Sequence, residues 1–131
     1  MDHIVVPGLS EFEDRWHFSH VVRDGERLYL SGVTGTGEDG RVDPDPARQF
    51  EQAFVHLDMY LSAAAASMQD IVELTTYHVD LRDHLTTFME VKDRHICRPY
   101  PAWSAIGVSQ LITDGALVEL RVIARSPDAS T

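Results

Sequence analysis

Apolar residues recur at helical spacing in the middle of the chain. They are Phe50, Ala53, Phe54, Leu57, Tyr60, Leu61 and Ala64. These positions share one face of a helix with 3.6 residues per turn. Asp45 can cap this helix, and Pro46 can take its first position, where no N–H is needed. The pattern predicts an amphipathic helix from about Pro46 to Ala65.

Runs rich in β-forming residues lie on both sides of this helix. Residues 17–32 (HFSHVVRDGERLYLSG) hold two such runs around Asp24-Gly25, a strong turn signal, and predict a hairpin. Three more strands are predicted within residues 70–83, 103–111 and 117–125. The last two are separated by a turn at Asp114-Gly115.

A second, shorter helix is predicted over residues 87–95, with Phe88 and Val91 turned inward. The elements then follow the order β-β-α-β-α-β-β, which predicts an α+β fold with both helices on one face of a mixed sheet. The other face would carry Trp103, Ala105, Ile106 or their neighbours into water. Because an open apolar face of that size usually becomes a subunit interface, we expect a homo-oligomer.

Length and charge limit the classes of protein. A chain of 131 residues predicts a single domain over 1–131. The net charge is −10, lysine occurs once, at Lys92, and no basic cluster is present, which argues against nucleic acid or a membrane surface as a partner. No apolar run is long enough to span a membrane, the first residues do not resemble a signal peptide, and Cys97 has no intrachain partner. We therefore expect a cytoplasmic protein.

The seven histidines do not predict a metal site. His17 with His20, and His78 with Asp80, supply fewer than the three or four ligands that zinc requires, so we expect surface or edge histidines and no metal. The final residues, SPDAST, have the composition of a frayed tail.

Four segments, in the same order and spacing, resemble the Rid family, also called YjgF/YER057c/UK114. They are residues 18–32, 63–83, 100–108 and 117–124. The resemblance implies a chorismate-mutase-like α+β fold and a homotrimer with ligand clefts between neighbouring subunits. It also implies hydrolysis of reactive imines and enamines, with release of ammonia and without a metal or organic cofactor.

The resemblance assigns site residues one position at a time. In deaminating members, an arginine in a Pro-Ala-Arg stretch holds the substrate carboxylate; here that position is Trp103. A glutamate of the last strand, thought to activate water, matches Glu119. A Ser-Gly pair that ends the second strand matches Ser31-Gly32, and a cleft tyrosine matches Phe18.

The other matching positions depart from the family. A second glutamate corresponds to Arg121, a glutamine to Val33, and an asparagine of the second helix falls near Phe88 or Met89. The cleft has thus lost its carboxylate clamp and two polar groups and has gained apolar ones. We expect a more apolar or aromatic ligand than typical members bind.

Alternatives stay open for individual residues. Trp103 could be a ligand platform or part of a subunit interface. Glu119 could be an acid/base, since its apolar neighbours would raise its pKa, or an exposed strand carboxylate. Arg121 could pair with Glu119 or bind an anionic ligand, and Arg98 is a second candidate cation. Ser31 could contact a ligand or merely end a strand.

Three classes of function follow. The first is a cofactor-independent enzyme, hydrolytic or tautomerising, that acts on a small unsaturated compound with Glu119 as acid/base. The second is a non-catalytic binder or sensor that uses the same clefts. The third, an endoribonuclease or translation inhibitor, is opposed by the acidic charge.

Overall fold

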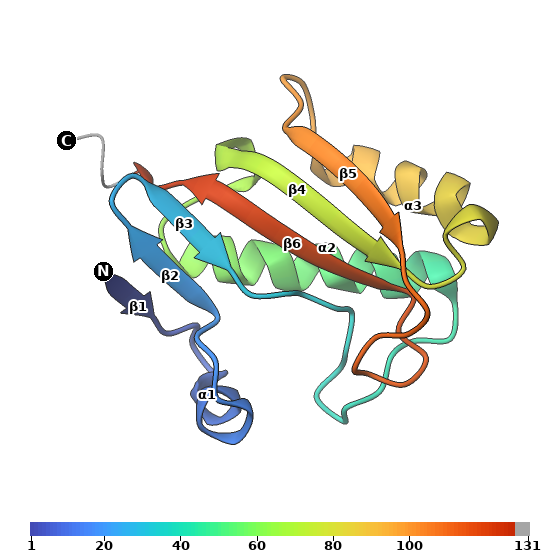
Figure 1. The fold of residues 1–131 in the computed structure, drawn as a ribbon, viewed down its shortest axis with the longest axis horizontal. Helices are drawn as coiled ribbons and strands as arrows, with labels where there is room; N and C mark the ends of the chain where they lie inside the picture. The colour runs from blue at the N-terminus through green and yellow to red at the C-terminus, as the bar shows by residue number, and fades with distance from the viewer. Residues whose placement is uncertain (128–131) are drawn as a thin grey trace.

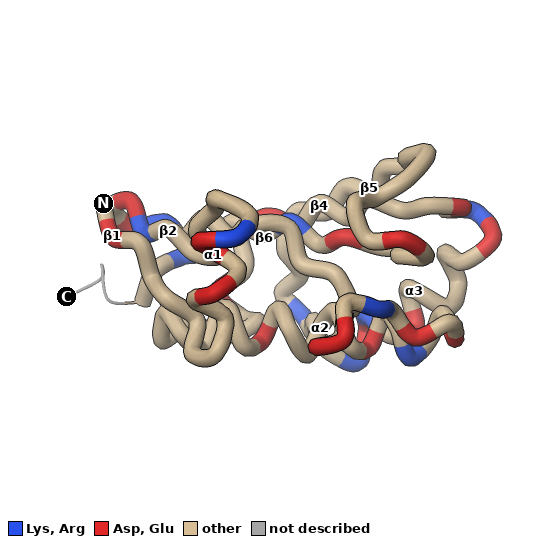
Figure 2. Tube along the Cα trace, turned by 90° about the horizontal axis from the view of Figure 1, so that it is seen from below, with Lys and Arg blue, Asp and Glu red and all other residues tan. Residues whose placement is uncertain are grey.

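The computed structural model describes residues 1–127 and has two layers, a six-stranded sheet and a pair of helices that cover one of its faces (Figure 1, Figure 2). The strands are β1 (Asp2–Ile4), β2 (Val21–Asp24), β3 (Arg27–Leu30), β4 (Ile71–His78), β5 (Ala102–Gly107) and β6 (Val118–Arg125). The helices are α1 (Ser10–Trp16), α2 (Pro46–Ala63) and α3 (Leu81–His95), with a 3-10 turn at Met68–Asp70. Of the tail predicted over 126–131, residues 128–131 lie outside the described part.

The sheet is mixed, as the sequence predicts. Its strand order is β1-β2-β3-β6-β4-β5, with β4 and β5 parallel and the other neighbouring pairs antiparallel. The β2–β3 hairpin turns through Gly25, whose φ of 61° lies in the left-handed region that glycine adopts without strain. This confirms the predicted opening hairpin.

Helix α2 forms because one of its faces is apolar and both of its ends are defined. Asp45 accepts a hydrogen bond from the Arg48 backbone N–H at 3.0 Å, and Pro46 occupies the first turn. The predicted apolar face is buried against the sheet, with Phe50, Phe54 and Leu57 inaccessible to solvent. The helix ends at Ala63 rather than Ala65, because Ala65 adopts a left-handed conformation.

Three element predictions were incomplete. Helix α3 begins at Leu81, six residues before the predicted start. It directly follows Asp80, the N-cap residue, whose φ of 56° turns the chain after β4. The sequence held a signal for this earlier start, because Leu81 and Leu85 lie four residues apart on the helix face that continues to Phe88. Helix α1 buries no residue and β1 is a three-residue strand, so neither has a periodic signal. None of the helices within the described residues combines the length and apolar composition that crossing a bilayer requires.

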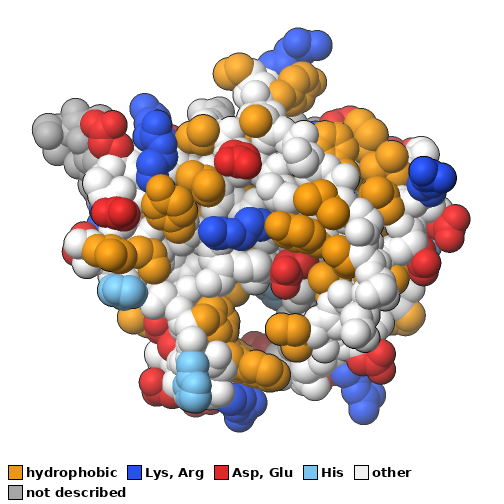
Figure 3. All heavy atoms as spheres, in the orientation of Figure 1, with side chains coloured by type: hydrophobic (Ala, Val, Ile, Leu, Met, Phe, Trp, Pro, Cys, Tyr) orange, Lys and Arg blue, Asp and Glu red, His pale blue; other side chains and the backbone are white. Residues whose placement is uncertain are grey.

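Of the residues expected on the uncovered side of the sheet, Ile106 lies there and Trp103 does not. Strand β5 pairs Trp103 with the buried Leu74, which places both side chains on the helix side of the sheet. Ile106 pairs with Tyr77 on the opposite side and is 42% exposed. We call that uncovered side the open face. Hydrophobic groups and charged groups alternate across it (Figure 3).

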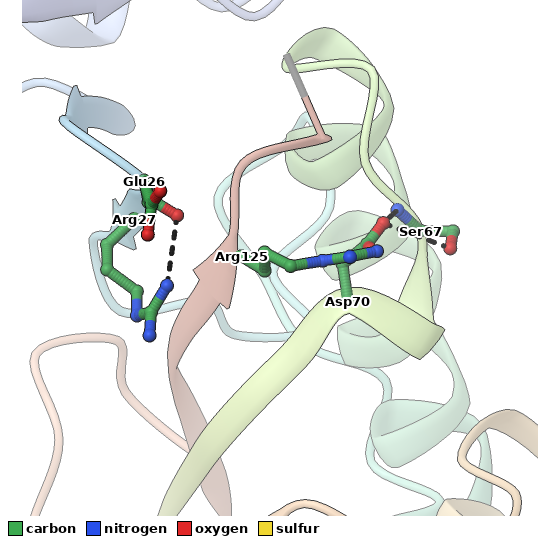
Figure 4. Close-up of polar contacts among 5 residues, drawn as sticks. All are labelled: Glu26, Arg27, Ser67, Asp70 and Arg125. Atoms are coloured by element: carbon green, nitrogen blue, oxygen red, sulfur yellow. Dashed lines mark hydrogen bonds and ion pairs between the residues drawn. The ribbon is translucent and has the colours of Figure 1, made fainter. Parts of the chain in front are cut away.

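A polar contact secures the end of β6. Arg125 Nη2 donates to Asp70 Oδ1 at 2.8 Å, and Asp70 Oδ2 accepts from the Ser67 backbone N–H at 2.9 Å (Figure 4). Partial burial raises the pKa of Asp70, but the hydrogen bonds from Arg125 and Ser67 outweigh it and hold the pKa below its usual range. The contact therefore joins the 3-10 turn before β4 to the last strand.

Candidate functional site

The first candidate region is a split between β3 and β6. Tyr29 pairs with Ile123, and Val33 forms a bridge with Leu120, so the path from Tyr29 to Val33 is one residue longer than the facing path. Such an extra residue bends a strand away from its partner. Arg121 extends into the split and donates a hydrogen bond to the backbone carbonyl of Leu30.

Glu119 lies against the backbone at this split. A Cβ placed on Gly32 would lie 2.5 Å from Glu119 Cδ and 2.8 Å from each carboxylate oxygen, so only glycine leaves room for this approach. Glu119 alternates with the core residues Val118 and Leu120 along β6, its side chain is half-buried, and burial raises its pKa above the usual value. Burial also raises the pKa of Tyr60 to about 12, with a further contribution from the negative charge of Glu119.

Two more sequence-predicted residues, Ser31 and Phe18, lie on the backbone segments that lead to Gly32 or pair with it. Ser31 follows β3, and its hydroxyl donates to the Ser19 carbonyl at 2.6 Å, so the hydroxyl helps to fix the backbone. The Phe18 ring lies 4.6 Å from the His20 ring, centroid to centroid, and the Ser31 backbone N–H donates to the His20 carbonyl at 2.9 Å. We call Phe18, Ser31, Gly32, Glu119 and Arg121 the Glu119 cluster.

The second candidate region lies at the other edge of the sheet, where β5 meets α3. A pocket of about 360 Å³ is lined by Met89, Lys92, Asp93, Tyr100, Pro101 and Trp103, and we call it the Trp103 pocket. The indole N–H donates to Thr76 Oγ1 at 3.0 Å, and this oxygen lies 2.7 Å from His78 Nε2. Because the indole N–H is already bonded, Trp103 can offer the pocket only its ring.

Lys92 is the residue that sequence reasoning missed. Its side chain is buried, and Nζ lies 4.4 Å from the centroid of the Trp103 ring and 5.9 Å from that of Tyr100. A signal existed, because Lys92 follows the inward-facing Phe88 by four residues and so shares its helix face. Phe88 itself is in the core, so Met89 is the position that reaches the pocket.

The two candidate cations have other contacts. The Arg98 guanidinium lies 5.0 Å from the Tyr100 ring centroid, and Arg98 is exposed and does not line the pocket. Within the described residues, Arg121 forms its hydrogen bond with Leu30 and has no ion pair with Glu119. A single chain therefore brings the Glu119 cluster together but leaves Trp103 and Arg98 apart from it.

The prediction of surface or edge histidines is wrong for His20 and His78. Both are buried, and burial lowers the pKa of His78 to about 4, so this ring is neutral near pH 7. Burial also lowers the pKa of His20. Over residues 1–127, no three His, Cys, Asp or Glu side chains are arranged to hold a metal ion.

Comparison with known proteins identifies the class and then the family. Solved structures with this α+β fold include one described as Protein YJGH, which is 34% identical, with a TM-score of 0.88 and 96% of each chain covered. Another is Rv2704 of Mycobacterium tuberculosis, a member of the YjgF/YER057c/UK114 family, which is 30% identical with a TM-score of 0.79. The match covers 93% of this chain and 97% of Rv2704. These likenesses confirm the predicted fold class.

The family follows from the sequence matches. The model of the Endoribonuclease L-PSP family matches residues 9–126. The RutC family protein YjgH of Escherichia coli K12 is 38% identical over 112 residues, covering 85% of this chain and 84% of that protein. The chain therefore belongs to the Endoribonuclease L-PSP family, the same YjgF/Rid group that its segments resemble.

Proposed function

We propose that this protein is a cofactor-independent small-molecule enzyme that hydrolyses a reactive imine or enamine, with Glu119 as the general acid/base. The observation that carries the proposal is the position of Glu119. Its carboxyl group is half-buried against Gly32, and its pKa is raised by burial. A carboxyl group can exchange protons efficiently near neutral pH when its pKa is shifted toward that pH.

The reaction needs two proton transfers to form a carbinolamine and two more to expel ammonia from it. Water adds to the carbon of the C=N bond, one proton moves to the nitrogen, and the resulting carbinolamine loses ammonia to leave a carbonyl compound. Protonated Glu119 can donate to the imine nitrogen, and its carboxylate can then accept a proton from the attacking water. In the second step the same carboxyl group can donate to the amine nitrogen as ammonia leaves and accept the hydroxyl proton as the carbonyl forms. Because the carboxyl group starts and ends in the same protonation state, the cycle closes without another reactant.

We further propose that the active unit is a homotrimer whose clefts join the Glu119 cluster of one copy to the Trp103 pocket of the next. Two observations support assembly. The open face carries exposed apolar side chains, including Tyr29 and Ile106 (Figure 3), and a single chain separates the two candidate regions. Sedimentation should give a mass near three times the 14.7 kDa of one chain. A stable monomer at assay concentrations would contradict this assembly.

The activity is tested with 2-imino acids generated in the assay from amino acids by an amino-acid oxidase. Ammonia release should depend on the protein, and Glu119→Gln should lower kcat by at least about 100-fold. Glu73→Gln is the matched control, because Glu73 is an exposed glutamate on the neighbouring strand β4. Its rate should equal that of the wild type.

Two outcomes would replace this proposal. Saturable ligand binding without turnover of any imine would support a non-catalytic binder on the same clefts. Cleavage of RNA by nuclease-free protein would support the activity in the family's name. The net charge of −10 opposes the second outcome, because binding to phosphates usually requires a basic surface.

A further inference from the structure

We propose that the Trp103 pocket binds a small planar monocarboxylate and that the Lys92 ammonium is its anion-binding group. This inference rests on the proposed function, since it names the substrate class for the same cleft. Neither Arg98 nor Arg121 lines the pocket, whereas Lys92 does.

The surroundings of Lys92 provide attraction but no acceptor. The residue is 6% exposed, and within the described residues its ammonium forms no hydrogen bond or ion pair, but solvent reaches the ammonium itself. Its ammonium contacts the Trp103 and Tyr100 rings, at 4.4 and 5.9 Å from their centroids. Ring faces attract a cation, but an ammonium has three N–H donors that rings cannot fully satisfy. A carboxylate in the pocket would replace water as the acceptor and form a charge-assisted hydrogen bond.

The walls of the pocket favour a flat ligand. Trp103 presents only its ring, because its N–H is bonded to Thr76. Tyr100 is 56% exposed and Met89 is also exposed, so both offer apolar surface to a bound molecule. A volume of about 360 Å³ is within the range of small-molecule sites. Conjugated carboxylates can therefore stack on an aromatic wall while their charge reaches Lys92.

The other charges around the pocket limit the ligand to a single negative charge. Asp93 also lines the pocket, and although water screens this exposed carboxylate, it disfavours a second negative charge. Arg94, two residues from Lys92, is directed to Glu51, with Nη2 3.5 Å from Oε2. Arg98 packs on Tyr100 from the exposed loop. Lys92 is therefore the cation placed to hold a monocarboxylate.

Fluorescence titration tests the proposal on the intact protein. The chain has two tryptophans, and Trp16→Phe leaves Trp103 as the reporter. The probes are benzoate, its neutral and nearly isosteric analogue benzamide, and the non-aromatic carboxylate acetate. Benzoate should bind at least about 10-fold more tightly than either analogue, because charge-assisted hydrogen bonds and ring stacking are both required. Equal binding of benzoate and benzamide, or no saturable binding of benzoate, would overturn the proposal without any variant.

Variants then identify the cation. Lys92→Met keeps the buried stem and removes the charge, and it should weaken benzoate binding about 10- to 100-fold. Lys92→Arg should retain most of the affinity, and Arg94→Met is the matched control that should bind as the wild type does. Undiminished binding by Lys92→Met, or its loss in Arg98→Met alone, would refute the role of Lys92.

The same titration separates this inference from the proposed function. Glu119→Gln should still bind benzoate while losing imine hydrolysis. Lys92-dependent binding in a protein that hydrolyses no imine would refute only the enzymatic proposal. Imine hydrolysis with a KM unaffected by Lys92→Met would refute only the inference about Lys92.

Discussion

Replacing Gly32 by alanine places a methyl group in the space that the Glu119 carboxyl group occupies. The new Cβ would lie 2.5 Å from Glu119 Cδ, whereas ordinary van der Waals contact begins at 3.4 Å. The carboxyl group must therefore move by roughly 1 Å. Because it is the far end of a flexible side chain, it can move without displacing the backbone.

Two opposing effects set the change in stability. Driving the Glu119 side chain off its preferred rotamer costs about 0.5–1.5 kcal/mol. Alanine also restricts the unfolded chain, which stabilises the protein by about 0.4–1 kcal/mol. This gain applies because Gly32 is not in the left-handed region. The two effects nearly cancel, so Gly32→Ala alone should change the free energy of unfolding by less than about 1 kcal/mol.

A double-mutant cycle isolates the clash. Glu119→Ala removes the carboxyl group, so Gly32→Ala should become stabilising in that background, with a coupling energy of about 0.5–1.5 kcal/mol. Glu119→Gln is the matched control, because it keeps the shape and should keep the clash. Urea unfolding at one fixed protein concentration measures all the variants. A coupling below about 0.3 kcal/mol with Glu119→Ala would show that the carboxyl group does not lie against Gly32.

Three further predictions concern pH and packing, each measured by urea unfolding. Burial raises the folded pKa of Glu119, so its contribution to stability is full below the unfolded pKa and is lost as pH rises through the folded pKa. The stability of Glu119→Gln relative to the wild type should therefore increase as pH rises through that range, and a constant difference in the free energy of unfolding would contradict this. The folded pKa of Asp70 is lowered, so its contribution to stability has the opposite pH dependence. Asp70→Asn should cost about 1 kcal/mol of stability at neutral pH, and this cost should disappear as pH falls through the folded pKa. A cost that persists in acid would count against the Arg125 contact. Phe88→Ala should cost about 3–5 kcal/mol, because its ring is inaccessible to solvent; a cost under about 1 kcal/mol would mean that the core refills the space.

The sequence by itself determined the elements whose signals are local. Helix α2 follows from a repeat of apolar residues and from the cap at Asp45, and the β2–β3 hairpin follows from its Asp24-Gly25 turn. Contiguous residues encode both signals, so no distant contact is needed to recognise them. The sequence analysis also named the direction of the Glu119 pKa shift, but not its cause, because Val118 and Leu120 point to the opposite side of the strand and so do not bury the carboxyl group.

Only the tertiary structure decided where Trp103 and Lys92 point. Strand β5 has no clean alternation of apolar and polar residues, so its sequence does not fix which side faces the helices, and its pairing with β4 decides this. A lysine in a helix is usually solvated, and only the packing of α3 beside β5 encloses the Lys92 ammonium between two rings. The partner of Arg121 likewise depends on how β3 and β6 separate, because its hydrogen bond to Leu30 connects residues about 90 positions apart in the chain. These contacts depend on the relative placement of distant segments, which local residue patterns do not specify.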